Sequence, residues 1–544
     1  MSNQENEVNE AIEAQVEQIE QLYETEYEIG EQNINPLGLD LHNPVFLVSS
    51  LLILLFVVGS LLFPEQSNSA LGATRVWIGD VFDWLFLSAG NLFVLFCLAL
   101  IVLPVGKIRI GGVDAKPDYS VLSWFAMLFA AGMGIGLMFW SVAEPVAYFT
   151  EWYGTPLNIA GGSEEAKMAA LGATMYHWGL HPWAIYAVVG LSLAFFAYNK
   201  GMPLTIRSAF YPLLGDRVWG PIGHVIDTLA VLATMFGLAT SLGLGAQQAA
   251  SGLAFLFGIS DGLQTQIAII ILVTVIALLS VMRGINGGVR VLSNLNMGLA
   301  ILLLFFVMIA GGIVALIANV GTTLSAYAQY ILPLSNPIGR EDETFYHGWT
   351  IFFWAWWISW SPFVGMFIAR VSRGRTVRQF VTAVLLIPTL VTVLWMSAFG
   401  GGAIDQVMEG VGALAGGISE SSLALFQMLE NLPFAAFTSL LAIVLVLVFF
   451  ITSSDSGSLV IDSITSGGKT DAPQAQRLFW ATIEGLVAGV LLAVGGVAAL
   501  QALQAAAVST GLPFVIVLLA MCVSLAMGLY HEHILLRHAP DKAA

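Results

Sequence analysis

The sequence predicts an all-α polytopic membrane protein, and three observations lead to this fold class. Hydrophobic residues make up 57% of the 544 residues and charged residues only 10%, whereas a soluble domain carries about 25% charged residues. Apolar runs long enough to cross a bilayer recur along the chain. Basic residues gather in alternate loops between these runs. This composition excludes a soluble enzyme, a disordered protein and a nucleic-acid binder.

Twelve apolar runs have the length of a membrane-spanning helix. They lie near 44–63, 82–103, 121–141, 168–197, 222–257, 264–282, 291–318, 349–370, 379–401, 433–454, 477–500 and 510–530. With the N-terminus inside, 16 of the 19 Lys and Arg fall in inner loops, and only Arg75, Lys167 and Arg340 fall outside. Adding or losing one span would destroy this asymmetry, because every later loop would change sides. We therefore expect twelve spans with both termini cytoplasmic.

The net charge of −17 arises mostly in the N-terminal segment. Residues 1–43 contain ten Glu and Asp40 but no Lys or Arg, which gives −11. The ordinary interpretation is a solvated, partly helical arm, and the alternative is a regulatory contact with basic cytoplasmic loops. The acidic start is not a signal peptide, because that would need a basic region before its apolar core. Cys97 and Cys522 lie inside apolar runs, so no disulfide framework is expected.

The third span is expected to be interrupted near its middle. It reads FAAGMGIGLMFWSVAEP, with Gly132, Gly134 and Gly136 within five residues, and each Gly costs a helix about 1 kcal/mol relative to Ala. Unwound backbone in a membrane must line a cavity or be buried in protein. Its freed carbonyls can bind Na⁺ and its freed amides a carboxylate. Close helix packing through the small residues is the alternative.

Aromatic side chains cluster in the fourth and eighth spans. HWGLHPWAIYA places Trp178, Trp183 and Tyr186 within one sector of a helix, and Pro182 can bend that helix.

The eighth span contains WTIFFWAWWISWSPFVG. Trp349 and Trp354 fit the interfacial belt, whereas Trp356, Trp357 and Trp360 lie deeper. Clustered rings in a low-dielectric setting suit a cation that cannot donate hydrogen bonds, such as a quaternary ammonium. An aromatic packing cluster between helices is the alternative.

The tenth span ends in FFITSSDSGS, which places four hydroxyl groups beside Asp455: those of Thr452, Ser453, Ser454 and Ser456. Hard cations prefer oxygen ligands, so this segment can bind an ion. The alternative is that the hydroxyls bond back to carbonyls of their own helix.

These segments resemble the betaine/choline/carnitine transporter (BCCT) family. The motifs GMGIGLMFW with VAEP, HWGLHPWAIYA, WTIFFWAWWISWSPFVG and TSSDSGS occur in order over nearly the whole twelve-span region. The resemblance implies two five-helix inverted repeats, spans 3–7 and 8–12, after two extra helices. It also implies a homotrimer in the bacterial cytoplasmic (inner) membrane, surrounded by lipids, and transport by alternating access.

The resemblance also divides the chain. The expected parts are an acidic cytoplasmic arm (1–43), two peripheral transmembrane helices (44–103), the first repeat (104–318), an outer loop with an amphipathic helix (319–348), the second repeat (349–530) and a short cytoplasmic tail (531–544).

The resemblance further implies the site residues. The substrate's ammonium group is expected in a box of Trp178, Trp183, Tyr186, Trp357 and Trp360, with Trp356 beside it and the backbone of Met133, Gly134 and Gly136 close by. A Na⁺ site maps to Ala130, Met133, Phe449, Thr452 and Ser453. A second Na⁺ site maps to Thr234, Leu238 and Phe363. Leu238 stands where the sodium-coupled pattern has Thr and offers no oxygen, so Ser241 or backbone carbonyls would have to supply the missing ligand. No cofactor besides the coupling ion Na⁺ is expected.

Gly136 indicates the class of substrate, and the absence of a particular Met and Arg indicates the coupling ion. Choline-type members carry Asp at the position of Gly136, and a carboxylate there would repel a zwitterion's own anion. We therefore expect a zwitterion and no carboxylate at the site: glycine betaine first, with dimethylsulfoniopropionate, carnitine and ectoine as alternatives. Sodium-independent members carry a Met and an Arg that this chain lacks, with Val364 in the eighth span, which favours Na⁺.

Other mechanisms and protein classes remain as alternatives. Proton coupling or exchange would use intramembrane acids, of which the candidates are Glu144, Asp227, Asp455 and Glu484. A channel would need polar stripes along whole spans, and an enzyme would need a metal or nucleophile set. His177 and His181 have a metal-like i, i+4 spacing but no further ligands beside them, so neither class is favoured.

Overall fold

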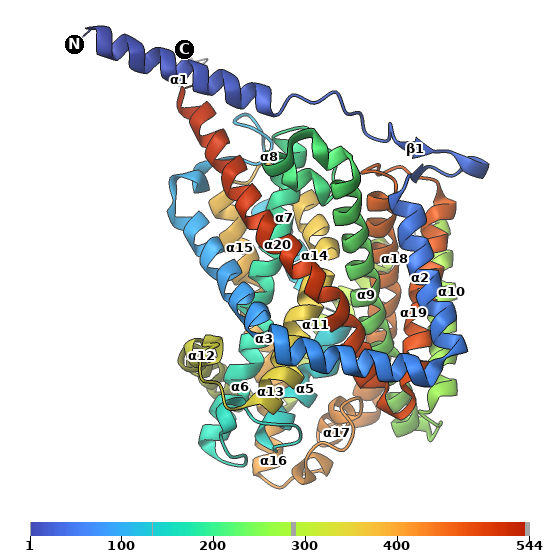
Figure 1. Cartoon of the computed structure of the whole chain (residues 1–544). Helices are drawn as coiled ribbons and strands as arrows, with labels where there is room; N and C mark the ends of the chain where they lie inside the picture. Colours follow the sequence, from blue (N-terminus) through green and yellow to red (C-terminus); the bar gives the residue numbers. More distant parts are fainter. Residues whose placement is uncertain (1, 133, 284–289, 539–544) are drawn as a thin grey trace.

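The structure is a computed structural model, and it describes residues 2–132, 134–283 and 290–538. Helices form nearly all of it, with one small two-stranded sheet near the N-terminus (Figure 1). The strands are β1 (Asn33–Ile34) and β2 (Leu41–His42), paired antiparallel. The helices are α1 (Ser2–Leu22), α2 (Val45–Leu62), α3 (Pro64–Val102), α4 (Val121–Gly132), α5 (Ile135–Phe149), α6 (Glu164–Trp178), α7 (Leu180–Tyr198), α8 (Tyr211–Leu214), α9 (Pro221–Phe257), α10 (Leu263–Arg283), α11 (Arg290–Ala310), α12 (Ile313–Ser335), α13 (Glu343–Phe345), α14 (Ile351–Val371), α15 (Val377–Met396), α16 (Gly402–Met408), α17 (Ala424–Glu430), α18 (Ala435–Thr465), α19 (Gln474–Gly495) and α20 (Ala499–His538).

The apolar helices confirm a many-spanning membrane protein but not the number twelve. Within the described residues, ten helices are long and apolar enough to cross a membrane, or eleven if the bent pair α4 and α5 counts as one span. One of the ten is the 65-residue segment Gln474–His538, which the short turn Gly496–Ala498 divides into α19 and α20. The two last expected spans fall inside this one segment, and the inverted-repeat layout stays a prediction.

The third span is interrupted where its glycines predict. Helix α4 ends at Gly132, α5 begins at Ile135, and the two are bent by 63°. Gly134 caps α5 in an extended conformation with φ of −166°, and Met133 lies outside the described residues. The break therefore exposes backbone groups in the middle of the bundle.

The fourth span is also broken, one turn before the proline that sequence analysis points to. Helix α6 ends at Trp178 and α7 begins at Leu180, with Gly179 between them. The hydroxyl of Tyr327 on α12 accepts a hydrogen bond of 2.8 Å from the backbone N–H of Leu180, and a Cβ on Gly179 would lie 2.6 Å from that hydroxyl oxygen. The glycine is required because α12 approaches the chain at this point.

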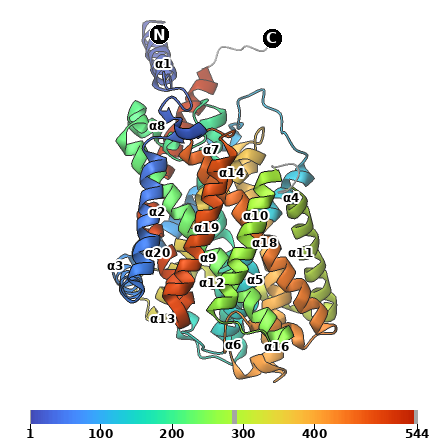
Figure 2. The same ribbon diagram turned by 90° about the vertical axis from the view of Figure 1, so that its right-hand side faces the viewer.

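Helix α14 is the central helix of the bundle. It packs against α7, α9 and α20, and it also touches α3, α4 and α18. Figure 2 shows α2 and α11 near opposite edges of the molecule. Residues on α14 are therefore positioned from all sides by other helices.

The acidic arm contacts the end of the bundle at which both termini lie (Figure 1). Several of its side chains between Tyr23 and His42 contact the bundle, while others, such as Leu37, are exposed, so the segment is only partly solvated. Tyr27 stacks on Trp219 with ring centroids 4.1 Å apart, and Asp40 pairs with Lys469 at 2.6 Å. Its partners are aromatic and basic groups far away in the sequence, which composition cannot identify.

The docked arm is expected to loosen in acid because of His42. His42 is fully buried, and Arg207 Nη1 lies 2.9 Å from its Nε2. Burial, together with the charges of Arg207 and His224, lowers the pKa of His42 to about 3. An undocked His titrates near 6.5, so the stability of docking is complete above that pH and falls as pH decreases from about 6.5 towards 3.

Hydrogen exchange of residues 33–42 at pH 7.5 and pH 5 tests this expectation. Burial acts to raise the pKa of Asp40, but hydrogen bonds from Lys469 and Asn33 outweigh it and lower that pKa, so the ion pair persists over this range. After correction for the intrinsic effect of pH on exchange, we expect faster exchange at pH 5 than at pH 7.5 in the parent chain but not in His42→Gln. Equal protection at both pH values would contradict the role given to His42.

Candidate functional site

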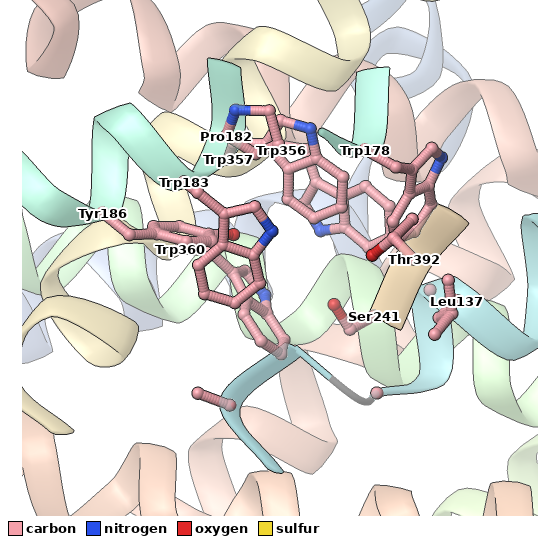
Figure 3. Close-up of a pocket in the computed structure, with 13 residues that line it drawn as sticks. Leu137, Trp178, Pro182, Trp183, Tyr186, Ser241, Trp356, Trp357, Trp360 and Thr392 are labelled. Atoms are coloured by element: carbon pink, nitrogen blue, oxygen red, sulfur yellow. The ribbon is translucent and has the colours of Figure 1, made fainter. Parts of the chain in front are cut away.

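A cavity in the middle of the bundle is lined mainly by aromatic side chains from three helices (Figure 3). We call six of them, from α6, α7 and α14, the aromatic cage: Trp178, Trp183, Tyr186, Trp356, Trp357 and Trp360. The other lining residues are Ala131, Gly134, Gly136, Leu137, Pro182, Ser241 and Thr392. The cavity is narrow, with a volume of about 40 Å³. The structure thus brings together all six predicted aromatic residues with Gly134 and Gly136 of the α4–α5 break.

The rings of the cage meet edge to face and in stacks. Trp178 and Trp357 have centroids 4.8 Å apart with planes at 73°, and Trp183 meets Tyr186 at 5.3 Å and 78°. Trp356 stacks on Trp357 at 4.8 Å and 16°. Such arrangements are favourable for aromatic pairs, and the ring faces carry the negative potential that attracts an onium group.

Hydrogen bonds outside the cavity hold three of the indoles. Trp357 donates its Nε1–H to the carbonyl of His177 at 2.9 Å, and Trp356 donates to the carbonyl of Gly237 at 3.3 Å. Trp178 donates to Oε2 of Glu144 at 2.6 Å. Because these donors are already engaged, their rings are left to interact through their faces, which suits a ligand without hydrogen-bond donors.

Gly136 is required by the packing of the cage. A Cβ at this position would lie 2.5 Å from Trp356 and 3.2 Å from Trp178, whereas nothing lies within 4 Å of a Cβ at Gly134. From the sequence, Gly136 is explained by charge, because the Asp found at this position in choline-type members would add a carboxylate. The structure adds a steric reason, because any side chain here enters the space of two cage rings.

A second cavity of about 180 Å³ lies beside the cage, and we call it the oxygen-lined pocket after its four hydroxyl side chains and one amide, although most of its lining residues are apolar. It shares Ala131 and Trp360 with the cage. Its other lining residues are Ala130, Ser293, Asn296, Met297, Phe363, Val364, Phe367, Phe449, Thr452, Ser453 and Ser456. Four of the five residues predicted for the first Na⁺ site line this pocket, and the fifth, Met133, lies outside the described residues.

The hydroxyl of Thr452 bonds back to its own helix and also lines a pocket, so it combines the two alternatives that the sequence allows for the tenth span. Its hydroxyl lies 3.1 Å from the carbonyls of Val448 and Phe449, so it bonds back to its own helix. It also lines the oxygen-lined pocket, where Asn296 of α11 approaches it at 3.3 Å through Nδ2. Oδ1 of Asn296 is buried and has no partner among the described residues. Asn296 is not among the site residues predicted from the sequence, where the only sign of a role for it is an amide side chain within an apolar run.

The residues of the doubtful second Na⁺ site face different places. Ser241 lines the aromatic cage and Phe363 lines the oxygen-lined pocket. The hydroxyl of Thr234 donates to the carbonyl of Ala230 at 2.7 Å. Leu238 is fully buried, and its side chain lies where a Cβ of Gly457 would be. The four positions do not converge on one cavity of the described chain, and the second site stays a prediction.

The interfacial-belt interpretation of Trp349 and Trp354 is wrong. Both are buried, and belt residues would face lipid. Trp349 donates to the carbonyl of Tyr153 at 2.8 Å, and Trp354 stacks on His181 with centroids 5.2 Å apart. Neighbouring helices cover this end of α14, and position along a span does not reveal such covering.

His177 and His181 have hydrogen-bonding roles. His181 Nε2 lies 3.2 Å from the amide oxygen of Asn91, and His177 contacts Glu144 and Thr350. Within the described residues no group of three or more His, Cys, Asp or Glu side chains could hold a metal ion.

Glu144 is the unexpected neighbour of the site. From the sequence, Glu144 is a proton-relay candidate, and its place in the VAEP motif favours a structural role. The structure places its carboxylate one hydrogen bond behind a cage ring, as the bond from Trp178 shows. Glu144 does not line the cavity itself, so the expectation that no carboxylate takes the place of Gly136 stays a prediction.

Comparison with known proteins agrees with this arrangement. Residues 44–534 match the profile of the betaine/carnitine/choline family of transporters. The chain is 64% identical to glycine betaine transporter 1 of Vibrio parahaemolyticus, over 93% of this chain and 97% of that one. It is 60% identical to a glycine betaine/proline/choline/ectoine transporter of the same organism, over 93% and 91%, and 44% identical to the glycine betaine transporter OpuD of Bacillus subtilis, over 88% and 92%. The chain therefore belongs to the betaine/carnitine/choline transporter family and is a membrane transporter.

Proposed function

We propose that this transporter imports a zwitterionic methylated onium compound, glycine betaine first, by Na⁺ symport with alternating access. The observation that carries the proposal is the aromatic cage beside the oxygen-lined pocket, with Ala131 and Trp360 common to both. Glycine betaine in the names of relatives at 64% and 44% identity supports the choice of substrate.

The two ends of the substrate bind to different parts of the cavity in this proposal. The methylated ammonium group lies against the ring faces of the cage, where it is held by cation–π attraction. The carboxylate lies against the backbone amides at the start of α5, near Gly134 and Gly136, because a helix N-terminus favours an anion. Met133, which is expected to contribute to the same site, lies outside the described residues.

Sodium binds in the oxygen-lined pocket in this proposal. Carbonyl groups at Ala130, Met133 and Phe449 and the hydroxyls of Thr452 and Ser453 supply its ligands, as hard cations prefer. Because the cage and this pocket share residues, an ion that orders the α4–α5 break also orders the substrate cavity. Each ligand then strengthens binding of the other by the same factor.

The assembly is part of the proposal. The chain would form a homotrimer in a bacterial inner membrane with both termini cytoplasmic. The distribution of basic residues supports this orientation, as does the position of α1 and the last turns of α20 at one end of the molecule (Figure 1), whereas the homotrimer rests on the family alone.

Labelled uptake into proteoliposomes under separate gradients tests substrate and coupling. We expect glycine betaine to accumulate with an inward Na⁺ gradient and not when K⁺ replaces Na⁺, with no loss on adding a protonophore. Full uptake in K⁺ that a protonophore abolishes would establish proton coupling instead. Dimethylsulfoniopropionate, carnitine, ectoine and choline form the competitor panel, since one relative's name includes choline and ectoine. Counterflow of unlabelled substrate separates a carrier from a channel.

A further inference from the structure

The carboxylate of Glu144 is enclosed directly behind the aromatic cage. Glu144 lies on α5 and is fully buried. Its Oε2 accepts the indole N–H of Trp178 at 2.6 Å. Its Oε1 lies 2.7 Å from His177 Nδ1 and 3.0 Å from the hydroxyl of Tyr148.

These contacts present donors to both carboxylate oxygens. An indole N–H can only donate, so Oε2 must accept. Thr350 Oγ1 lies 2.9 Å from His177 Nε2, which fits a neutral ring that accepts at Nε2 and donates its Nδ1–H to Glu144. No Lys or Arg forms an ion pair with Glu144 in the described part of the chain.

The same cluster also reaches a second ring of the cage. His177, which contacts Glu144 through its side chain, accepts the indole N–H of Trp357 with its carbonyl at 2.9 Å. Trp178 and Trp357 meet edge to face at 4.8 Å. The orientation of this ring pair is therefore determined by groups outside the cavity.

We propose that Glu144 is a positioning residue for substrate binding: it fixes the indole of Trp178 through its N–H and makes the ring face more attractive to a cation. The inference rests on the proposed function, because it needs an onium group in the cage. An indole N–H donates in the plane of its ring, so the carboxylate lies at the edge of the Trp178 ring, and the indole gains electron density on the faces that an onium group meets. The substrate's positive charge is thus attracted by a ring that an anion polarises from its edge, and low polarity makes this effect stronger.

A double-mutant cycle between Glu144→Gln and Trp178→Phe tests this inference. Glutamine keeps the shape and an acceptor oxygen but removes the charge, and phenylalanine keeps a ring but removes the N–H. With glycine betaine uptake at saturating Na⁺, we expect Glu144→Gln to raise KM about tenfold with little change in Vmax, as for loss of a hydrogen bond to a charged group. In the Trp178→Phe background, Glu144→Gln is expected to change KM less than about twofold, because the N–H through which it acts is gone.

Tyr148→Phe is the matched control, because it removes another donor to the same carboxylate without touching the cage. We expect its KM within about twofold of the parent value. An unchanged KM in Glu144→Gln, an equal effect of Glu144→Gln in both backgrounds, or an equal effect of Tyr148→Phe would overturn the inference. If Glu144→Gln does not yield folded protein, Glu144→Asp replaces it in the cycle, because aspartate keeps the charge but is one methylene too short to reach the Trp178 N–H as glutamate does. A raised KM that Trp178→Phe abolishes supports the inference, and an unchanged KM or an equal rise in both backgrounds overturns it. Absence of glycine betaine uptake by the parent chain would refute the proposed function itself.

Discussion

Replacing Trp357 by leucine is expected to weaken binding of glycine betaine about thirtyfold, which corresponds to about 2 kcal/mol for one desolvated cation–π contact. Trp357 is the ring that touches most of the cage, since it meets Trp178 edge to face and stacks on Trp356. Leucine has no π-system, so it fills part of the space without attracting an onium group. Equilibrium binding of labelled glycine betaine to the purified protein measures the loss.

Two further variants separate loss of attraction from loss of folding. Trp84→Leu is the matched control, because Trp84 is 56% exposed on α3, and its affinity is expected to equal that of the parent chain. Trp357→Phe keeps a ring but loses the bond to the carbonyl of His177, and we expect an intermediate affinity. Equal affinities of Trp357→Leu and Trp84→Leu would refute the placement of the ammonium group in the cage.

Adding a single methyl group at Gly136 is expected to reduce glycine betaine uptake at least tenfold. The Cβ of Gly136→Ala would lie 2.5 Å from Trp356, so this ring must move, and overpacking of a tight core costs about 1–3 kcal/mol. Trp356 is nearly fully buried and stacks on Phe352 and Trp357. Its displacement therefore disturbs the cage rather than only the local helix.

Gly134→Ala is the contrasting variant. Nothing lies within 4 Å of a Cβ at Gly134, and its φ of −166° is open to any residue. We expect a much smaller loss of uptake than for Gly136→Ala, and similar losses in both variants would show that backbone flexibility, not ring packing, requires these glycines. Gly136→Asp adds a carboxylate as well as the Cβ that displaces Trp356, so we expect glycine betaine uptake to fall at least as far as in Gly136→Ala, while the added charge favours a monocation such as choline.

Sequence patterns were sufficient where the physics is local. Three glycines within five residues weaken any helix, and α4 does end among them. Trp356, Trp357 and Trp360 share α14, so their proximity could be predicted from helical periodicity, whereas the break at Gly179 places Trp178 on α6 and Trp183 and Tyr186 on α7. The hydroxyls of Thr452 and Ser453 likewise share a short segment, and the structure places both in one pocket.

Local patterns failed where a distant element decides the environment. Tyr27 and Asp40 belong to an acidic, polar segment that composition describes as solvated, but Trp219 and Lys469 hold them against the bundle. Trp349 and Trp354 occupy an end of a span where a tryptophan normally faces the interface, yet other helices bury both. In each case the deciding neighbour lies far along the chain.

The sequence by itself determined that this chain is a membrane transporter of the betaine/carnitine/choline family, and which aromatic and hydroxyl residues are candidates for its site. Only the tertiary structure decided that the cage and the oxygen-lined pocket share a wall, that Asn296 meets Thr452, and that the carboxylate of Glu144 holds Trp178. The physical reason is the range of the interactions. Periodicity and helix propensity act within a few residues, whereas the bond from Trp178 to Glu144 joins different helices 34 residues apart and exists only after those helices have packed.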